Sequence, residues 1–159
     1  MNDVPCSYPV ALGLNITTGI NNTPKLLGVF RNESSINSLT AILQIIQAIA
    51  HSPNKDTVVA IQFLALPSAT GGVWSSITGS ELEVNKTATV TGGKVASTLY
   101  CSVSEAHGSS SELTTLADLN AKDLGLELKK GQKFAIYATT GESGATCSVA
   151  WAVNWIEKD

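Results

Sequence analysis

The sequence contains only two histidines, the residue type used most often as a general acid or base near neutral pH. His107 lies in a polar stretch with the serines of residues 109–111, so a Ser-His-Asp arrangement with Asp118 is conceivable. That stretch lacks the Gly-x-Ser-x-Gly turn that exposes a serine nucleophile, and a solvated loop is the better interpretation. His51 falls at the mouth of another predicted loop.

Other chemistry-bearing residues are equally scattered. Cys6, Cys101 and Cys147 are too far apart to supply paired ligands for zinc or a disulfide framework, so we expect three thiols. Several carboxylates could pair across strands as glycosidase acids do, although chance gives such neighbours in any domain; they are Glu81, Glu83, Glu105, Glu112, Asp118 and Asp123. We therefore predict no catalytic, cofactor-binding or metal site and no enzymatic activity.

Composition points to assembly. The 159 residues are enough for one domain, and 43% of them are apolar. Only 14% are charged, against about 25% in a typical soluble domain, so we expect much of the surface to contact other protein. The net charge of −3 without a Lys/Arg stripe predicts no direct nucleic-acid partner. No apolar run is long enough for a membrane, and no secretory signal is present, which predicts synthesis in a cytoplasm without export.

Two alternating segments near the end of the chain carry the clearest strand signal. They are Lys133 to Thr140 and Thr146 to Ile156, and the turn between them at residues 141–144 predicts a hairpin. Their large residues are expected to pack in the core or between subunits; these are Trp151, Trp155, Phe134 and Ile136. The opposite side of the last segment is small and uncharged, as if another sheet or subunit approached it closely.

The middle of the chain predicts further strands at sandwich spacing. A meander is expected from Trp74 to Ile77, Glu81 to Val90 and Lys94 to Val103. Residues 38–51 fit either a helix or a strand, and a strand in a hairpin with Thr57 to Leu66 is the favoured interpretation. The fold class is thus all-β, an antiparallel jelly-roll-like β-sandwich of about eight strands.

Residues 1–26 are expected to form an extended N-terminal arm, and residues 27–159 the sandwich domain. The arm contains three prolines, which deny donors to a sheet, and shows no strand or helix period from Asn15 to Pro24. Its apolar residues need a surface to lie on, so they are candidate contacts to a partner protein. These candidates are Val4, Pro5, Tyr8, Pro9, Val10, Leu12 and Leu14. Trp74, Tyr100 and His107 are candidates for surface recognition.

Four segments together resemble small jelly-roll virion proteins of tailed bacteriophages, in particular capsid decoration or cement subunits. They are Trp74-Ser-Ser-Ile-Thr-Gly-Ser80, Thr89-Val-Thr-Gly-Gly93, Leu128-Lys-Lys-Gly131 through Ile136, and the closing Ala152-Val-Asn-Trp155-Ile-Glu157. The resemblance covers roughly residues 57 to 157. It implies a homotrimer on the capsid exterior that clamps neighbouring major capsid proteins and needs no cofactor.

Two other functions remain open, because one β-sandwich design serves many roles. A fibre-head module would recognise a receptor or glycan through surface loops and exposed rings. A single-jelly-roll shell protein would form the capsid itself, but such proteins often carry a basic arm, and Lys25 is the only base in the first 26 residues.

Overall fold

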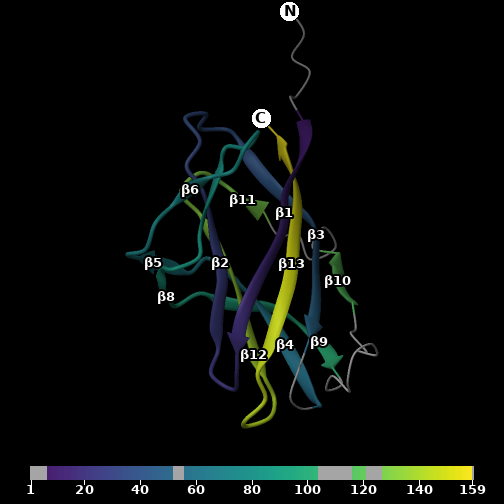
Figure 1. The fold of residues 1–159 in the computed structure, drawn as a ribbon. Coiled ribbons are helices and arrows are strands. Elements are labelled where there is room, and N and C mark those ends of the chain that lie inside the picture. The colour runs from purple at the N-terminus through teal and green to yellow at the C-terminus, as the bar shows by residue number, and fades with distance from the viewer. Residues whose placement is uncertain (1–6, 52–55, 104–115, 121–126, 159) are drawn as a thin grey trace, which may run out of the picture.

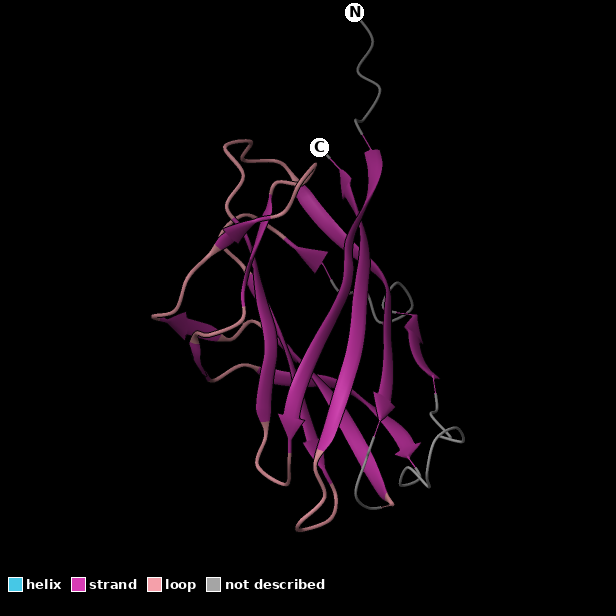
Figure 2. Ribbon diagram, in the orientation of Figure 1, coloured by secondary structure: helices cyan, strands magenta, loops and turns pink. Residues whose placement is uncertain are grey.

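The computed structural model describes residues 7–51, 56–103, 116–120 and 127–158. Every regular element in these ranges is a β-strand, and Figure 2 shows arrows and loops without a helix. The strands form two antiparallel sheets and one small ribbon. Figure 1 shows the two sheets as the layers of a sandwich, with β1 and β13 side by side along one of them.

The first sheet is built around the long C-terminal strand. β13 (Cys147–Lys158) pairs with β1 (Ser7–Ile20) on one side and with β3 (Thr40–His51) on the other. Two short segments, β10 (Leu116–Asn120) and β11 (Glu127–Leu128), also pair with β3 and follow one another along it. They behave as one interrupted strand, so this sheet has the order β1-β13-β3-β10.

The second sheet has the order β6-β7-β2-β12-β4-β9. Its long strands are β2 (Lys25–Asn32), β12 (Lys133–Thr140), β4 (Thr57–Ala65) and β9 (Lys94–Val103). The shorter β7 (Leu82–Asn85) and β6 (Ser75–Ser76) extend it beyond β2. β5 (Ser68–Thr70) and β8 (Thr89–Thr91) form a separate two-stranded ribbon.

The connections between the long strands follow a jelly roll. Among the long strands and β10, the chain crosses from one sheet to the other after β1, β2 and β3, has both β4 and β9 in the second sheet, and crosses again to reach β10, β12 and β13 in turn. The resulting four-strand orders, β1-β13-β3-β10 and β2-β12-β4-β9, are those of two interlocked Greek keys. The predicted all-β, jelly-roll-like sandwich is confirmed.

The core lies between the sheets and is rich in aromatic rings. Trp151, Trp155 and Phe134 are each 1% exposed, and Ile136 is fully buried, so the large face of the last strand points inward as its alternation predicts. Phe30 lies edge-on to Trp155, with ring centroids 6.1 Å apart. Such aromatic pairs contribute about 0.5 to 1.5 kcal/mol beyond the burial of their area.

The N-terminal segment belongs to the sandwich more closely than the sequence indicates. Residues 1–6 lie outside the described residues, but β1 is hydrogen-bonded along β13 from Ser7 to Ile20. Ile20 is fully buried in the core, and the expected boundary at residue 26 falls inside β2. The segment is extended, as expected, but from Ser7 onward it is a strand of the first sheet rather than an arm outside the fold.

Three predicted strand pairings are wrong, because alternation reveals which face is buried but not which strand lies alongside. β12 and β13 lie in different sheets and form no hairpin, and the same is true of β3 and β4. Residues 40–51 are nevertheless a strand, as favoured. Of the expected meander only the antiparallel pairing of β6 with β7 is present, because β7 otherwise pairs with β2, β8 with β5, and β9 with β4.

Candidate interaction surfaces

The outward side of β13 presents a row of uncharged side chains at the centre of the first sheet. Its inward residues alternate with Ser148, Ala150, Ala152, Asn154 and Ile156, all of them half-buried. Ile16 on β1 pairs with Ala150 and is 67% exposed. An outward row on a solvated sheet is ordinarily polar or charged, so this row is suited to contact with another protein.

The outward side of the second sheet is also uncharged over most of its width. On β4 the outward positions are Val58, Ala60, Gln62 and Leu64. Gln62 pairs with Tyr137 on one side and Thr98 on the other, and Ala60 pairs with Tyr100, which is 67% exposed. Burial raises the pKa of the Tyr137 hydroxyl, consistent with a partly covered position on this face. We call this surface over β12, β4 and β9 the second-sheet face.

A loop covers the remaining corner of the second sheet. The fully buried Asn85 donates a hydrogen bond from Nδ2 to the carbonyl of Gly71 at 3.0 Å. Gly72 adopts φ +69°, and a Cβ there would lie 2.5 Å from Asn85 Oδ1. Only glycine fits this close approach, so the loop is fixed to β7 and limits the extent of the exposed face.

A cluster of charge lies beside that corner. Arg31 Nη2 is 2.8 Å from Glu83 Oε1, and the Arg31 guanidinium lies 4.0 Å above the centre of the Trp74 ring. Trp74 was expected to be an exposed ring, but it is half-buried because Arg31 covers one face. The ring therefore serves as a cation–π partner, and this face of it is not free to stack on a ligand.

The candidates for surface recognition do not converge. Trp74 contacts Arg31 of β2, near the β6-β7 edge of the second sheet, whereas Tyr100 lies on β9 at the opposite edge. His107 lies outside the described residues. The two placed rings are thus separated by β12 and β4, and they do not form one binding site.

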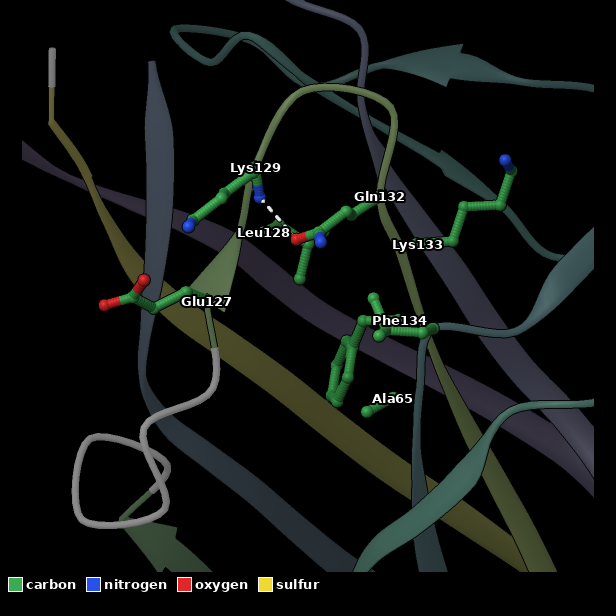
Figure 3. A pocket seen from close by; sticks show the side chains of 8 residues that line it. Ala65, Glu127, Leu128, Lys129, Gln132, Lys133 and Phe134 are labelled. Atoms are coloured by element: carbon green, nitrogen blue, oxygen red, sulfur yellow. Dashed lines mark hydrogen bonds between the residues drawn. The ribbon is translucent and has the colours of Figure 1, made fainter. Parts of the chain in front are cut away.

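A cavity opens at one end of the sandwich, between β11, the start of β12 and the end of β4 (Figure 3). Its volume is about 280 Å³, and its floor is formed by the buried Phe134 and Leu128 together with Ala65. Gln132 Oε1 accepts a hydrogen bond from the backbone N–H of Lys129 at 2.9 Å and fixes the turn above the floor. We call this site the end cavity.

Leu66 lies at the lip of the end cavity in an unusual conformation. Its φ is +57°, a left-handed value rare for a residue with a bulky side chain, and it is 61% exposed. Its backbone N–H donates to the carbonyl of Lys133 at 3.1 Å. Neither the cavity nor Leu66 was predicted from the sequence, because the site joins residues 65–66 to residues 127–134, which are distant in the chain.

Buried polar side chains hold the loops at this end of the sandwich. Asn32 Nδ2 donates to the carbonyls of Leu39 and Leu128 at 3.0 and 2.9 Å. The carboxylate of Glu157, fully buried, accepts from the backbone N–H of Glu81 at 2.6 Å and from the indole N–H of Trp155 at 3.3 Å. These contacts are structural, since each hydrogen-bonds a neighbouring loop or core ring.

The residues considered for catalysis or metal binding are not brought together in the described part of the chain. Asp118 lies on β10, opposite Gln47, while His107 and the serines of residues 109–111 lie outside the described residues. Among the residues that the structure describes, no three His, Cys, Asp or Glu side chains are grouped as metal ligands would be. Cys101 and Cys147 are buried and are not joined in a disulfide, and burial raises the pKa of the Cys101 thiol.

Only some of the candidate contact residues of the arm belong to the described part of the chain. Val4 and Pro5 lie outside it, whereas Tyr8, Pro9, Val10, Leu12 and Leu14 belong to β1. Tyr8 pairs with Glu157, and Pro9 with Ile156.

The part of the chain that the structure describes contains no helix long and apolar enough to span a membrane.

Chains similar to this one occur in solved structures of infectious bursal disease virus. A structure of infectious bursal disease virus, Gx strain, contains a chain similar to this one at 10% identity and TM-score 0.35, and the similarity covers 99% of this chain and 37% of that one. A crystal structure of an infectious bursal disease virus particle gives 8% identity, TM-score 0.34, and coverage of 99% and 36%. The present chain spans little more than a third of those virus chains. No family model and no curated protein matches the sequence.

Proposed function

We propose that this chain is a structural subunit of a virus particle, and that it acts as a decoration or cement subunit on the capsid exterior. The observation that carries the proposal is the combination of a jelly-roll sandwich with uncharged outward rows on both sheets. The fold recurs in capsid and lectin domains, so it permits this function without fixing it. The outward rows favour assembly over an isolated monomer.

The physical reason is the solvation of the two sheets. A monomer that keeps both sheets in water gains solubility from charged outward side chains. Here the outward positions of β4 and the row on β13 contain none, whereas charged residues such as Arg31 and Glu83 gather at one corner. A neighbouring subunit that covers an uncharged face buries apolar area without having to desolvate ions.

A cement function requires that one subunit contact several neighbours. In the proposed arrangement three copies associate around a threefold position and hold adjacent capsid proteins through many weak contacts. Binding energy summed over a lattice stabilises the particle without an active site.

The rival hypothesis of a receptor- or glycan-binding fibre head needs exposed rings that converge on one site. Trp74 is covered by Arg31, and Tyr100 lies at the other edge of the second sheet. The described surface therefore favours the assembly hypothesis.

The test is reconstitution on particles that lack this protein. Purified chain is mixed with undecorated heads, and the bound copies are counted after sedimentation. Saturable binding at a fixed number of copies per head supports the proposal. Closed shells formed by the chain alone would identify a shell protein instead, and binding to immobilised glycans without binding to heads would favour the fibre-head function.

A further inference from the structure

The end cavity differs in chemistry from the two sheet faces. Its floor is apolar, with Phe134 and Leu128 buried beneath it. Its walls come from both sheets, because Glu127 and Leu128 lie on β11 whereas Phe134 lies on β12. A site of this shape accepts apolar side chains rather than an ion or a polar metabolite.

The lip of the end cavity adds an exposed apolar side chain. Leu66 combines a left-handed backbone with 61% exposure, so the strained conformation does not serve to bury the side chain in its own core. Strain of this kind persists where the surrounding structure enforces it, and it often marks a binding site. An occupant of the cavity would cover Leu66.

The rim of the end cavity has an excess of positive charge. Lys129 is exposed and Lys133 is half-buried, and Figure 3 shows their side chains extending from opposite sides of the cavity. Glu127 is the acidic residue of the lining. A segment with one acidic side chain beside apolar ones would complement this rim.

The chain itself contains such a segment directly before β1. Residues 2–6 read Asn-Asp-Val-Pro-Cys, with Asp3 next to Val4 and Pro5 and no basic side chain. β1 begins at Ser7, opposite Lys158, at the same end of the sandwich as the end cavity. This placement follows from the register, since Lys158 pairs with Thr40, and the adjacent Ala41 pairs with Leu128 of the cavity floor.

The length of the segment before β1 bears on whether residues 2–6 bind in the end cavity of their own chain or of a neighbouring copy of the chain. From β1 to β11 the sheet is crossed in three strand steps, through β13 and β3, which amounts to about 14 Å. Val4 precedes Ser7 by three residues and so can lie at most about 10 Å from it. The backbone of Val4 therefore ends short of β11 in its own copy, and this favours the cavity of a neighbouring copy.

We propose that residues 2–6 of one copy bind in the end cavity of a neighbouring copy, with Val4 and Pro5 on the apolar floor and Asp3 at the lysine rim. This inference rests on the proposed function, because it requires a neighbouring copy. It links subunits end to end and gives the exposed Leu66 a partner.

The test uses the native thiol of Cys6 as a reporter. Leu66→Cys places a second thiol at the lip, and mild oxidation should join it to Cys6 of a neighbouring copy, giving a dimer or larger species on a non-reducing gel. Cys101 and Cys147 are buried and should not compete. Ser143→Cys is the matched control, because residue 143 is exposed in the turn at the opposite end of the sandwich.

We expect at least tenfold more disulfide-linked product from Leu66→Cys than from Ser143→Cys, and its loss when Cys6→Ser is added. Gln132→Cys, on the other side of the cavity, should repeat the result if Leu66→Cys folds poorly. An oligomer that shows no excess product would overturn the docking but leave the proposed function standing. A disulfide formed within one copy, identified by peptide mass, would also overturn it. A monomer by light scattering would overturn both.

Discussion

The indole nitrogen of Trp151 donates a hydrogen bond to the hydroxyl oxygen of Thr17 at 3.1 Å. This contact joins the central strand of the first sheet to the strand that precedes the rest of the fold. Trp151 is 1% exposed, so its N–H has little access to water if the hydroxyl is removed. The N-terminal strand thus satisfies a buried donor of the core as well as covering the edge of β13.

Thr17→Val tests that contact with almost no change in side-chain shape. The valine cannot accept the indole hydrogen, and leaving a buried donor unpaired costs about 1 to 3 kcal/mol. We expect the free energy of unfolding in urea to fall by that amount. Thr18→Val, at the exposed neighbouring position, is the control and should change it by no more than about 0.5 kcal/mol. Equal effects of the two substitutions would show that the hydrogen bond contributes nothing.

Deletion of residues 2–20 should abolish cooperative unfolding. The truncated chain loses β1, leaves one edge of β13 unpaired and removes the buried Ile20. Deletion of residues 2–6 is the matched control, because it leaves β1 intact and should unfold with nearly the parent midpoint. Thermal unfolding followed by circular dichroism measures both. A sharp transition in the longer deletion would restore the interpretation of residues 7–20 as an arm outside the fold.

The sequence could not reveal β1 because two features hide it. Its register shifts between Leu12 and Asn15 and again between Thr17 and Ile20, so a regular alternation is lost. Pro9 lies on the edge strand of the sheet, a place where a missing backbone donor is tolerated, and it therefore did not exclude a strand.

Burial was easier to predict than pairing. The alternation of Trp151, Val153 and Trp155 defined a buried face that the structure contains. It held no information on whether β13 lies beside β12 or beside β1 and β3, because pairing is determined by crossings between sheets that no local pattern records. The end cavity was missed for the same reason, since its floor joins Leu128 of one sheet to Phe134 of the other.

Cys101 and Cys147 should resist alkylation in the folded protein. Burial raises the pKa of Cys101 above its ordinary value, so the reactive thiolate is scarce near pH 8. In the unfolded chain the Cys101 thiol has its ordinary pKa, so it ionises at a lower pH than in the folded protein. Its contribution to the free energy of unfolding is therefore constant below the ordinary thiol pKa and falls as the pH rises above it. Iodoacetamide labelling with and without urea, read by peptide mass, checks the assignment. Rapid labelling of either cysteine without urea would contradict it.

The uncharged outward rows should be sensitive to a single charge. Ala152→Glu on the first sheet and Ala60→Glu on the second-sheet face each place a carboxylate where a neighbour is proposed to pack. We expect at least one of them to lower occupancy on undecorated heads more than tenfold, since an unpaired buried charge is costly. Asn22→Glu, in the exposed turn after β1, is the control. Full occupancy with both variants would show that neither face contacts a partner.

The mass of the purified full chain in solution tests the central claim of assembly most directly. Light scattering coupled to size exclusion, at several protein concentrations, should give three times the chain mass of 16.6 kDa. The Ala152→Glu or Ala60→Glu variant that loses occupancy should shift towards the single-chain mass. A stable 16.6 kDa monomer of the parent chain at every concentration would contradict the account.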